Sequence, residues 1–448
     1  MHPVIRFALA RTWLSVFLLT LSWHAVAQKA PDIATTQPVA PVELEKAGAT
    51  PAVACAASAS WVTNPNPPQE IPGGGTNFCQ FYQFAWQWFF YLVSPSQADK
   101  TLRNFEVQAT YPQLQAQGVN SCTNTPTTRT FFVRTDKEAN PFGKMVLPKD
   151  TGQAGGGATI FDKAGNVVYY EVRFSRNQCT TPEGGNFPAG TTELKLAWRV
   201  LTDADAPRYY TIKAEIDDGK KKTPVLLGLI GFHLARSTAQ HPEFVWATWE
   251  HKENTPECLV PPPPPPAGWS FANAQCAQCL KTSTTGPLGC AQCKFNVAPA
   301  SPGLKGPPTQ ICRVYRDGSG PNDNKVTENI PVVDTLNAQL IGPAGIVSKL
   351  PPGHPMAVWR NYFNVGGLWV SDPKQPATLA NQRGSLQLTS SVMETTKQGQ
   401  FSLVGGKVQR GPAQNCFGCH TYSPPTPTTT SGLSHTFDDI KGGKTGGK

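Results

Sequence analysis

The sequence predicts an α+β fold, in which a β-rich antiparallel main domain packs around one buried aromatic helix and is followed by a small C-terminal segment. Three observations carry this prediction. Short segments with strand composition fill residues 129–251. An almost uninterrupted aromatic run covers residues 78–93. Two cysteines and a histidine stand close together at 416–420, near the end of the chain.

The N-terminal 27 residues have the pattern of a secretory signal peptide. Arg6 and Arg11 precede an apolar run from Trp13 to Trp23, and Ala25-Val26-Ala27 supplies the small residues of a cleavage site. The apolar run is too short to span a bilayer, so a membrane anchor is the weaker reading. We therefore expect export, cleavage before Gln28, and no membrane span in the mature chain.

The aromatic run predicts a buried helix over Phe78–Val93. Its strongly polar residues are three glutamines spaced three and four positions apart, which places them on one helical stripe: Gln80, Gln83 and Gln87. Asn77 is a suitable N-cap, and Ser94-Pro95 ends the helix. A helix that is apolar on nearly every other side belongs in a protein core.

Residues 129–251 predict a series of strands. The segments are rich in β-branched and aromatic residues and are separated by Gly, Pro and Asp-Gly turns, and their short spacing favours antiparallel pairing. The predicted strands are Thr130–Arg134, Val167–Phe174, Glu193–Leu201, Tyr209–Ile216, Val225–Ala235 and Phe244–Glu250. Further along the chain, we expect helices at Ile330–Ile341 and Leu386–Lys397 and an extended segment at Val358–Val370.

A cysteine-rich segment follows six consecutive prolines, Pro261–Pro266, which form a stiff extended stretch. It contains two Cys-x-x-Cys pairs, Cys276/Cys279 and Cys290/Cys293. Such pairs can hold tetrahedral zinc, or they can form disulfides in an oxidising compartment. Both alternatives stay open, with disulfides favoured, and in either case the segment is a structural staple.

These patterns divide the chain into six parts. They are a signal peptide (1–27), a flexible linker (28–60), a β-rich domain (61–260), a Pro/Cys-rich insert (261–315), a C-terminal region (316–437) and a disordered tail (438–448). The formal net charge is only +9, and Lys220–Lys222 is the one dense basic run. Nothing in this composition indicates nucleic-acid binding.

The motif Cys416-Phe417-Gly418-Cys419-His420 is the pattern of covalent c-type haem attachment. Two thiols at this spacing can form thioethers with the two vinyl groups of one haem, and the adjacent histidine can bind the iron. The rival interpretations are a Cys-x-x-Cys disulfide and a zinc site with an incidental histidine. The motif thus predicts one haem c held by Cys416, Cys419 and His420, so that the C-terminal region is a c-type haem-binding segment.

Several stretches together resemble a family of exported proteobacterial cytochrome c proteins. They are FAWQWFFYLVSP, ELKLAWRVL, LLGLIGFHLARST, FVWATWEHKEN, NYFNVGGLWV and SVMETTKQ, followed by NCFGCH. The family has phrases of the type W-x-T-F-E-H and C-x-x-C-H in this order, and Trp249 stands here where Phe is usual. The resemblance covers most of residues 78–437. It implies one covalent haem and an exported protein, and it supplies no substrate.

The second axial ligand of the iron is not given by the motif. Only 28 residues follow His420, and none of them is Met. The ligand is therefore His435, an upstream residue, or absent. The leading candidates are Met393, His435 and His251; the other upstream choices are His233, His241, His354, Met145 and Met356.

The ligand decides between two function classes. With both axial positions filled, the protein is an electron carrier that exchanges electrons with a redox protein partner in the periplasm. With an open distal site, it is a haem enzyme of peroxidase or oxygenase type, or a haem-based ligand-binding protein. We favour electron transfer. Whether the protein is an enzyme, and its oligomeric state, stay open at the level of sequence.

Overall fold

The computed structural model describes residues 55–115, 119–124, 128–132, 159–217, 221–259, 261–281, 293–297, 305–320, 326–399, 401–404, 407–410, 415–424 and 429–441. The predicted signal peptide (1–27), most of the predicted linker (28–60) and most of the predicted tail (438–448) lie outside these ranges.

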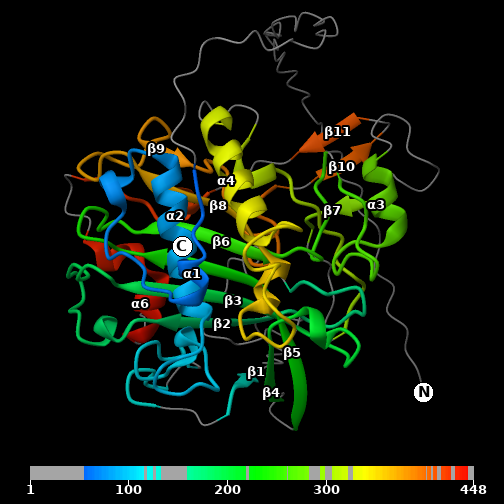
Figure 1. Ribbon diagram of the computed structural model, residues 1–448, viewed down its shortest axis with the longest axis horizontal. Helices are drawn as coiled ribbons and strands as arrows, with labels where there is room; N and C mark the ends of the chain where they lie inside the picture. Colours follow the sequence, from blue (N-terminus) through cyan, green and yellow to red (C-terminus); the bar gives the residue numbers. More distant parts are fainter. Residues whose placement is uncertain are drawn as a thin grey trace, which may run out of the picture. The chain divides into compact units, whose positions relative to one another are not determined.

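Eight strands of the described chain form one mixed sheet, which confirms an α+β fold with a β-rich main domain (Figure 1). Its strand order is β1-β4-β5-β6-β8-β9. In addition, β3 pairs with β5, and β2 pairs with β3. Every pairing is antiparallel except the parallel pair β1–β4. The strands are β1 (Thr130–Phe132), β2 (Tyr169–Phe174), β3 (Thr192–Val200), β4 (Thr211–Asp217), β5 (Lys222–Arg236), β6 (Val245–His251), β8 (Tyr362–Val370) and β9 (Gln382–Gly384).

The predicted aromatic helix is α2, Phe78–Val93, and the Asn77 side chain caps it by accepting a hydrogen bond from the Gln80 backbone N–H at 3.2 Å. The other helices are α1 (Ser60–Thr63), α3 (Ala274–Lys281), α4 (Val326–Ile341), α5 (Cys416–Cys419) and α6 (His435–Ile440). Among the described residues, no helix combines the length and the apolar character that crossing a bilayer requires.

Helix α2 covers one face of the sheet, with α4 packed beside it (Figure 1). Phe89 stacks on Trp249 of β6 with ring centroids 4.6 Å apart and meets Phe232 and Trp359 edge-on. Aromatic pairs of this kind each add about 0.5–1.5 kcal/mol beyond the burial of their area. This aromatic layer is the main core of the protein, and it fixes which face of β5, β6 and β8 points away from α2.

Two rows of side chains cross the opposite face, because residues paired across neighbouring strands point to the same side. The first row is Glu193, Ala235, Trp246 and Leu368, and the second is Lys195, His233, Thr248 and Gly366. Of these eight, only Lys195 is not fully buried. Another part of the chain must therefore cover this face.

The main sheet crosses the predicted domain boundaries. Strand β8, from the predicted C-terminal region (316–437), pairs with β6 of the predicted β-rich domain (61–260). The two ranges therefore share one sheet rather than forming separate layers. Sequence reasoning placed a boundary here because the Pro/Cys-rich insert interrupts the strand pattern, but the chain returns to the sheet after the insert.

The prediction of a helix at Leu386–Lys397 is wrong, because these residues form turns. Glu250 of β6 explains the difference. Its carboxylate accepts hydrogen bonds from the Ser391 backbone N–H at 2.6 Å and from the Ser391 hydroxyl at 2.5 Å. These tertiary bonds to a buried acid take the place of helix formation, for which the local pattern gave only a weak preference.

The cysteine-rich insert forms a small core of its own at one side of the main sheet. Its strand β7 (Lys294–Phe295) pairs with β10 (Phe401–Val404), which in turn pairs with β11 (Lys407–Arg410). Disulfides Cys276–Cys293 and Cys258–Cys312 cross this core. Two more disulfides, Cys55–Cys79 and Cys122–Cys179, join other segments of the chain.

Replacing Phe89 with Ala should lower the free energy of unfolding by about 3–5 kcal/mol, because it leaves a cavity between three aromatic rings. Denaturant unfolding followed by circular dichroism measures this change. Leu379→Ala is the control, since Leu379 is 61% exposed and its truncation should change stability by less than about 0.5 kcal/mol. Equal stabilities for the two variants would contradict the central role of this aromatic layer.

Candidate functional site

The Cys-x-x-Cys-His motif lies on the face of the sheet that α2 leaves open. Phe417 meets Trp246 of the first row edge-on, with ring centroids 4.7 Å apart. The motif shares a second hydrophobic cluster with side chains of β5, β6, β8 and the C-terminal segment: Phe187, Ala235, Phe244, Trp246, Val365, Leu368, Val370, Leu386, Leu388, Cys416, Phe417, Tyr422, Leu433 and Phe437. The end of the chain thus completes the burial of the sheet.

Local hydrogen bonds set the conformation of the motif. Helix α5 is a single turn, and the Asn415 side chain caps it by accepting from the Gly418 backbone N–H at 3.1 Å. The Asn415 amide nitrogen donates to the Gln382 side-chain oxygen and to the Leu386 carbonyl, each at 2.7 Å. One side chain therefore shapes the turn and ties it to the segment that follows β8.

His420 is held as a neutral imidazole with a defined tautomer. Its Nδ1 donates to the Leu433 carbonyl oxygen at 2.6 Å, and a carbonyl can only accept. The side chain is buried, and burial lowers the pKa of His420 to about 3. With the proton on Nδ1, the lone pair of Nε2 remains for a ligand bond, as in histidines that bind metals.

The two cysteines of the motif are present as thiols, whereas the insert and two other places in the chain carry disulfides. Cys416 is buried, and burial raises the pKa of its thiol well above the ordinary value. Cys419 is exposed. One thiol therefore points into the cluster under the motif and the other toward its surface.

Charged groups next to the motif were missed by sequence reasoning. Lys195 and the buried Glu193 lie on the same face as Trp246, and Glu193 accepts hydrogen bonds from Gln178 at 3.1 Å and from the Ser434 hydroxyl. Burial raises the pKa of Glu193. The alternation of Glu193, Leu194 and Lys195 within an apolar strand was a signal that this face differs from the α2 face.

His435 is the distal candidate that lies beside the motif. Its ring centroid is 4.8 Å from that of His420, with the planes tilted by 50°. His435 is the first residue of α6 and is exposed, while its neighbours Ser434, Thr436 and Phe437 are buried. The segment that follows the motif therefore folds back and brings these two imidazoles together.

His251 does not fit the role that the sequence analysis gave it. Its Nε2 donates to the Arg208 carbonyl at 2.9 Å, and its Nδ1 accepts from the Glu253 backbone N–H at 3.2 Å. The ring stacks on Tyr209 with centroids 3.9 Å apart. Both nitrogens are thus engaged within the protein, and the ring is a structural element at the end of β6.

Met393, the third candidate, is buried against the sheet. A Cβ placed on Gly231 of β5 would lie 3.1 Å from the Met393 methyl carbon, so the missing side chain of this glycine makes room for Met393 and its neighbour Val392. Gly231 stands two residues before His233 on β5, so Met393 lies on the same face of the sheet as the motif, although it packs with the larger hydrophobic cluster.

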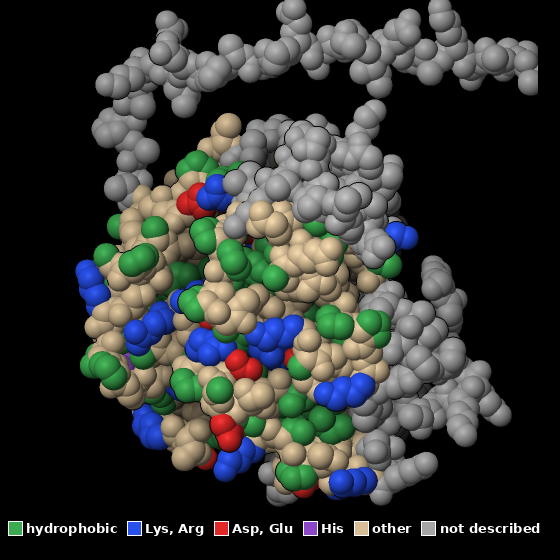
Figure 2. Space-filling view, turned by 90° about the vertical axis from the view of Figure 1, so that its right-hand side faces the viewer, with side chains coloured by type: hydrophobic (Ala, Val, Ile, Leu, Met, Phe, Trp, Pro, Cys, Tyr) green, Lys and Arg blue, Asp and Glu red, His purple; other side chains and the backbone are tan. Residues whose placement is uncertain are grey.

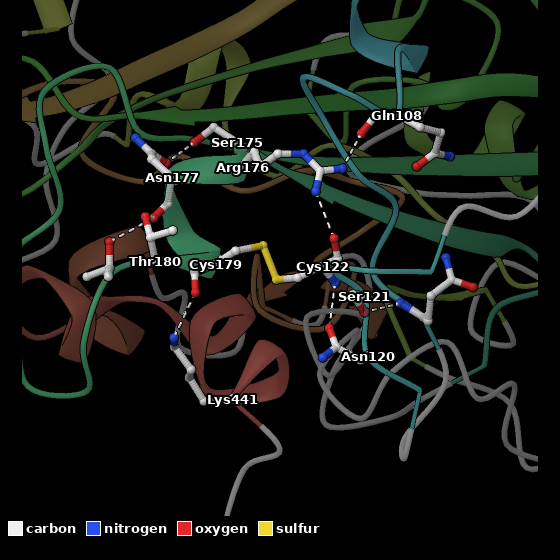
Figure 3. The surroundings of a disulfide bond; sticks show 12 residues. Gln108, Asn120, Ser121, Cys122, Ser175, Arg176, Asn177, Cys179, Thr180 and Lys441 are labelled. Carbon is white, nitrogen blue, oxygen red and sulfur yellow. Dashed lines mark hydrogen bonds between the residues drawn. A yellow bond between two sulfur atoms is a disulfide. The ribbon is translucent and has the colours of Figure 1, made fainter.

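The disulfide Cys122–Cys179 supports α6 from outside (Figure 3). Lys441, just after α6, donates to the Cys179 carbonyl at 3.2 Å, and Ile440 packs against the same buried cluster as both cysteines. Arg176 donates to the carbonyls of Gln108 and Cys122 on the far side of the same bond. The helix that carries His435 is therefore fastened to a cross-linked part of the chain.

The cysteine-rich insert has disulfides, the alternative that the sequence analysis favoured. Cys276 and Cys293 are joined, and Cys279 is also disulfide-bonded, whereas Cys290 lies outside the described residues. A sulfur in a disulfide has no thiolate to offer to zinc. Within the described ranges, no group of three or more His, Cys, Asp or Glu side chains is placed to hold a metal ion.

Comparison with known proteins yields no match. Neither a protein-family model, nor a curated protein, nor a solved structure is significantly similar to this chain.

His251 gives the stability of the protein a defined pH dependence. Burial lowers the pKa of His251 to about 3, below its ordinary value, so the unfolded chain binds this proton more readily. The contribution of neutral His251 to the free energy of unfolding is complete above about pH 6.5. It falls by up to about 1.4 kcal/mol per pH unit as the pH drops toward 3.

Replacing His251 with Phe keeps a ring against Tyr209 but removes two hydrogen bonds. We expect a free energy of unfolding lower by about 1–3 kcal/mol at pH 7 and a weaker loss of stability between pH 6.5 and pH 4. Denaturant titrations at a series of pH values measure both. The same pH slope in the variant and the wild type would show that His251 is not the titrating group.

Proposed function

We propose that this protein is a periplasmic mono-haem c-type cytochrome that transfers electrons through a covalently attached haem. The observation that supports this most is the state of the motif. Cys416 and Cys419 are thiols, whereas other cysteines of the described chain form disulfides, and the Nε2 lone pair of His420 is available because its Nδ1–H donates a hydrogen bond to the Leu433 carbonyl.

These groups fit haem c in kind and number. The thiols of Cys416 and Cys419 would form the two thioether bonds, and Nε2 of His420 would bind the iron. When bound, the haem supplies one-electron chemistry, with a potential that depends on its axial ligands, nearby hydrogen bonds and burial. A carbonyl bound to Nδ1 orients the imidazole and raises its basicity, which is the task of Leu433.

The surroundings of the motif support an electron carrier. Trp246 and Phe417 pack edge to face on the buried side of the motif, and burial of this kind is one of the factors that would set the potential of a bound haem. The disulfides are typical of a protein that folds in an oxidising compartment, which agrees with export to the periplasm.

A redox protein is the partner that this function requires. The face of the molecule on the side of α3 and β7 carries Lys and Arg side chains spread among apolar and uncharged groups (Figure 2). Without Arg6 and Arg11 of the predicted signal peptide, the formal net charge of +9 becomes +7, and this distribution favours weak, salt-sensitive attraction of an acidic partner rather than one tight docking patch.

The double variant Cys416→Ala with Cys419→Ala should contain no covalent haem, because it lacks both thiols. The wild-type protein and the variant are produced in a bacterium with haem-attachment machinery, and haem is detected after denaturing electrophoresis and by intact mass. The matched control is Cys276→Ala with Cys293→Ala, which removes a disulfide elsewhere and should keep the haem. Haem retained by the first variant, or absent from the wild type, would refute the proposal.

The electron-transfer assignment is tested on the haem-loaded wild-type protein. We expect reversible oxidation and reduction by small mediators and an absorption spectrum that carbon monoxide does not change. A spectrum that shifts with carbon monoxide would indicate an open iron site. The haem would then serve an enzyme or a ligand-binding protein instead.

A further inference from the structure

Two imidazoles from different turns of the C-terminal segment meet next to the motif. His420 and His435 have ring centroids 4.8 Å apart. His420 has its Nδ1 bound to Leu433, so the nitrogen that it can offer a metal is Nε2. Bonds of about 2 Å from imidazole to a metal separate two nitrogens on opposite sides of one ion by about 4 Å. The same two bonds put the two ring centroids about 6 Å apart, so the exposed His435 ring would have to turn away from His420 by more than about 1 Å to bind the opposite side of the same ion.

His435 owes this position to anchors on both sides of it. Leu433 is tied to His420, and the Ser434 hydroxyl donates to Glu193 on β3 while accepting from the Phe437 backbone N–H at 2.8 Å. Phe437 packs edge-on against Phe187 with ring centroids 5.2 Å apart. The backbone that carries His435 is therefore fixed, whereas its exposed side chain can rotate without disturbing the core.

The other two leading candidates and His233 have contacts of their own. Both nitrogens of His251 are hydrogen-bonded, and Met393 is buried against Gly231 of β5. His233 lies on the face under the motif with its Nδ1 paired with the Thr248 hydroxyl at 2.7 Å; unlike His435, it is buried and belongs to a central strand whose backbone is bonded on both sides. Among the described residues considered as ligands, His435 combines nearness to His420 with an exposed ring.

We infer that His435 is the second axial ligand, so that the iron is held by two histidines of one short segment, His420 and His435. This inference rests on the proposed function, since it requires the haem that the motif would attach. It has a chemical consequence: two imidazoles fill both axial positions of the iron and give a lower reduction potential than a histidine–methionine pair. The protein would then be an electron carrier closed to small ligands.

The test compares haem-loaded wild-type protein with His435→Ala, both purified after export. The wild-type protein should be low-spin in its ferric and ferrous states and unaffected by carbon monoxide. His435→Ala should become high-spin and bind carbon monoxide, and free imidazole added to the buffer should restore the low-spin spectrum. Restoration by imidazole separates loss of a ligand from general damage to the fold.

Two further variants sharpen the result. His435→Met should remain low-spin with a thioether ligand, and its reduction potential should rise. Met393→Leu is the matched control, which conserves volume in the core and should leave the spectrum unchanged.

The outcomes keep the two claims apart. Covalent haem with a spectrum that His435→Ala does not alter would overturn the ligand assignment and leave the proposed function standing. A spectral change in Met393→Leu would identify Met393 as the ligand in place of His435. Wild-type protein without haem, or with zinc instead of iron by metal analysis, would overturn both claims.

Discussion

The burial of the central strands on both faces is the constraint on which the rest of this structure depends. Helix α2 covers one face with an aromatic layer around Phe89 and Trp249. The opposite face presents Trp246 and a mixed row of charged and polar groups. Such a face is stable only when something covers it and satisfies its polar atoms. The C-terminal segment does this, and the Cys-x-x-Cys-His motif is part of the cover.

The cover is joined to the sheet by polar contacts as well as by packing. The Glu193 carboxylate on β3 accepts a hydrogen bond from the Ser434 hydroxyl. The Asn415 side chain donates hydrogen bonds to Gln382 and to the Leu386 carbonyl. Hydrogen bonds to buried charged groups contribute about 1.5–3 kcal/mol each, roughly twice the usual value. The C-terminal segment is therefore held in register on the sheet, so that both His420 and His435 have defined positions.

Covalent links reinforce an arrangement that the chain assembles from distant parts. Cys122–Cys179 closes a loop of 57 residues beside α6, and Cys258–Cys312 closes 54 residues around the insert. Cross-links over loops of this length stabilise a protein by about 2–4 kcal/mol, largely by restricting the unfolded chain. The chain is rich in Gly and Pro, which favour turns and loops, and the disulfides restrict the segments that they close.

The sequence by itself determined most of the local elements. Alternation and composition located the six strands before residue 251, and the glutamine stripe and Asn77 located α2, because each signal resides within the segment that it describes. Only the tertiary structure decided that β8 returns to the same sheet, that Ser391 bonds Glu250 instead of starting a helix, and that His435 rather than His251 lies beside His420. These outcomes depend on strand register and on contacts between residues far apart in the chain, and no local pattern encodes such contacts.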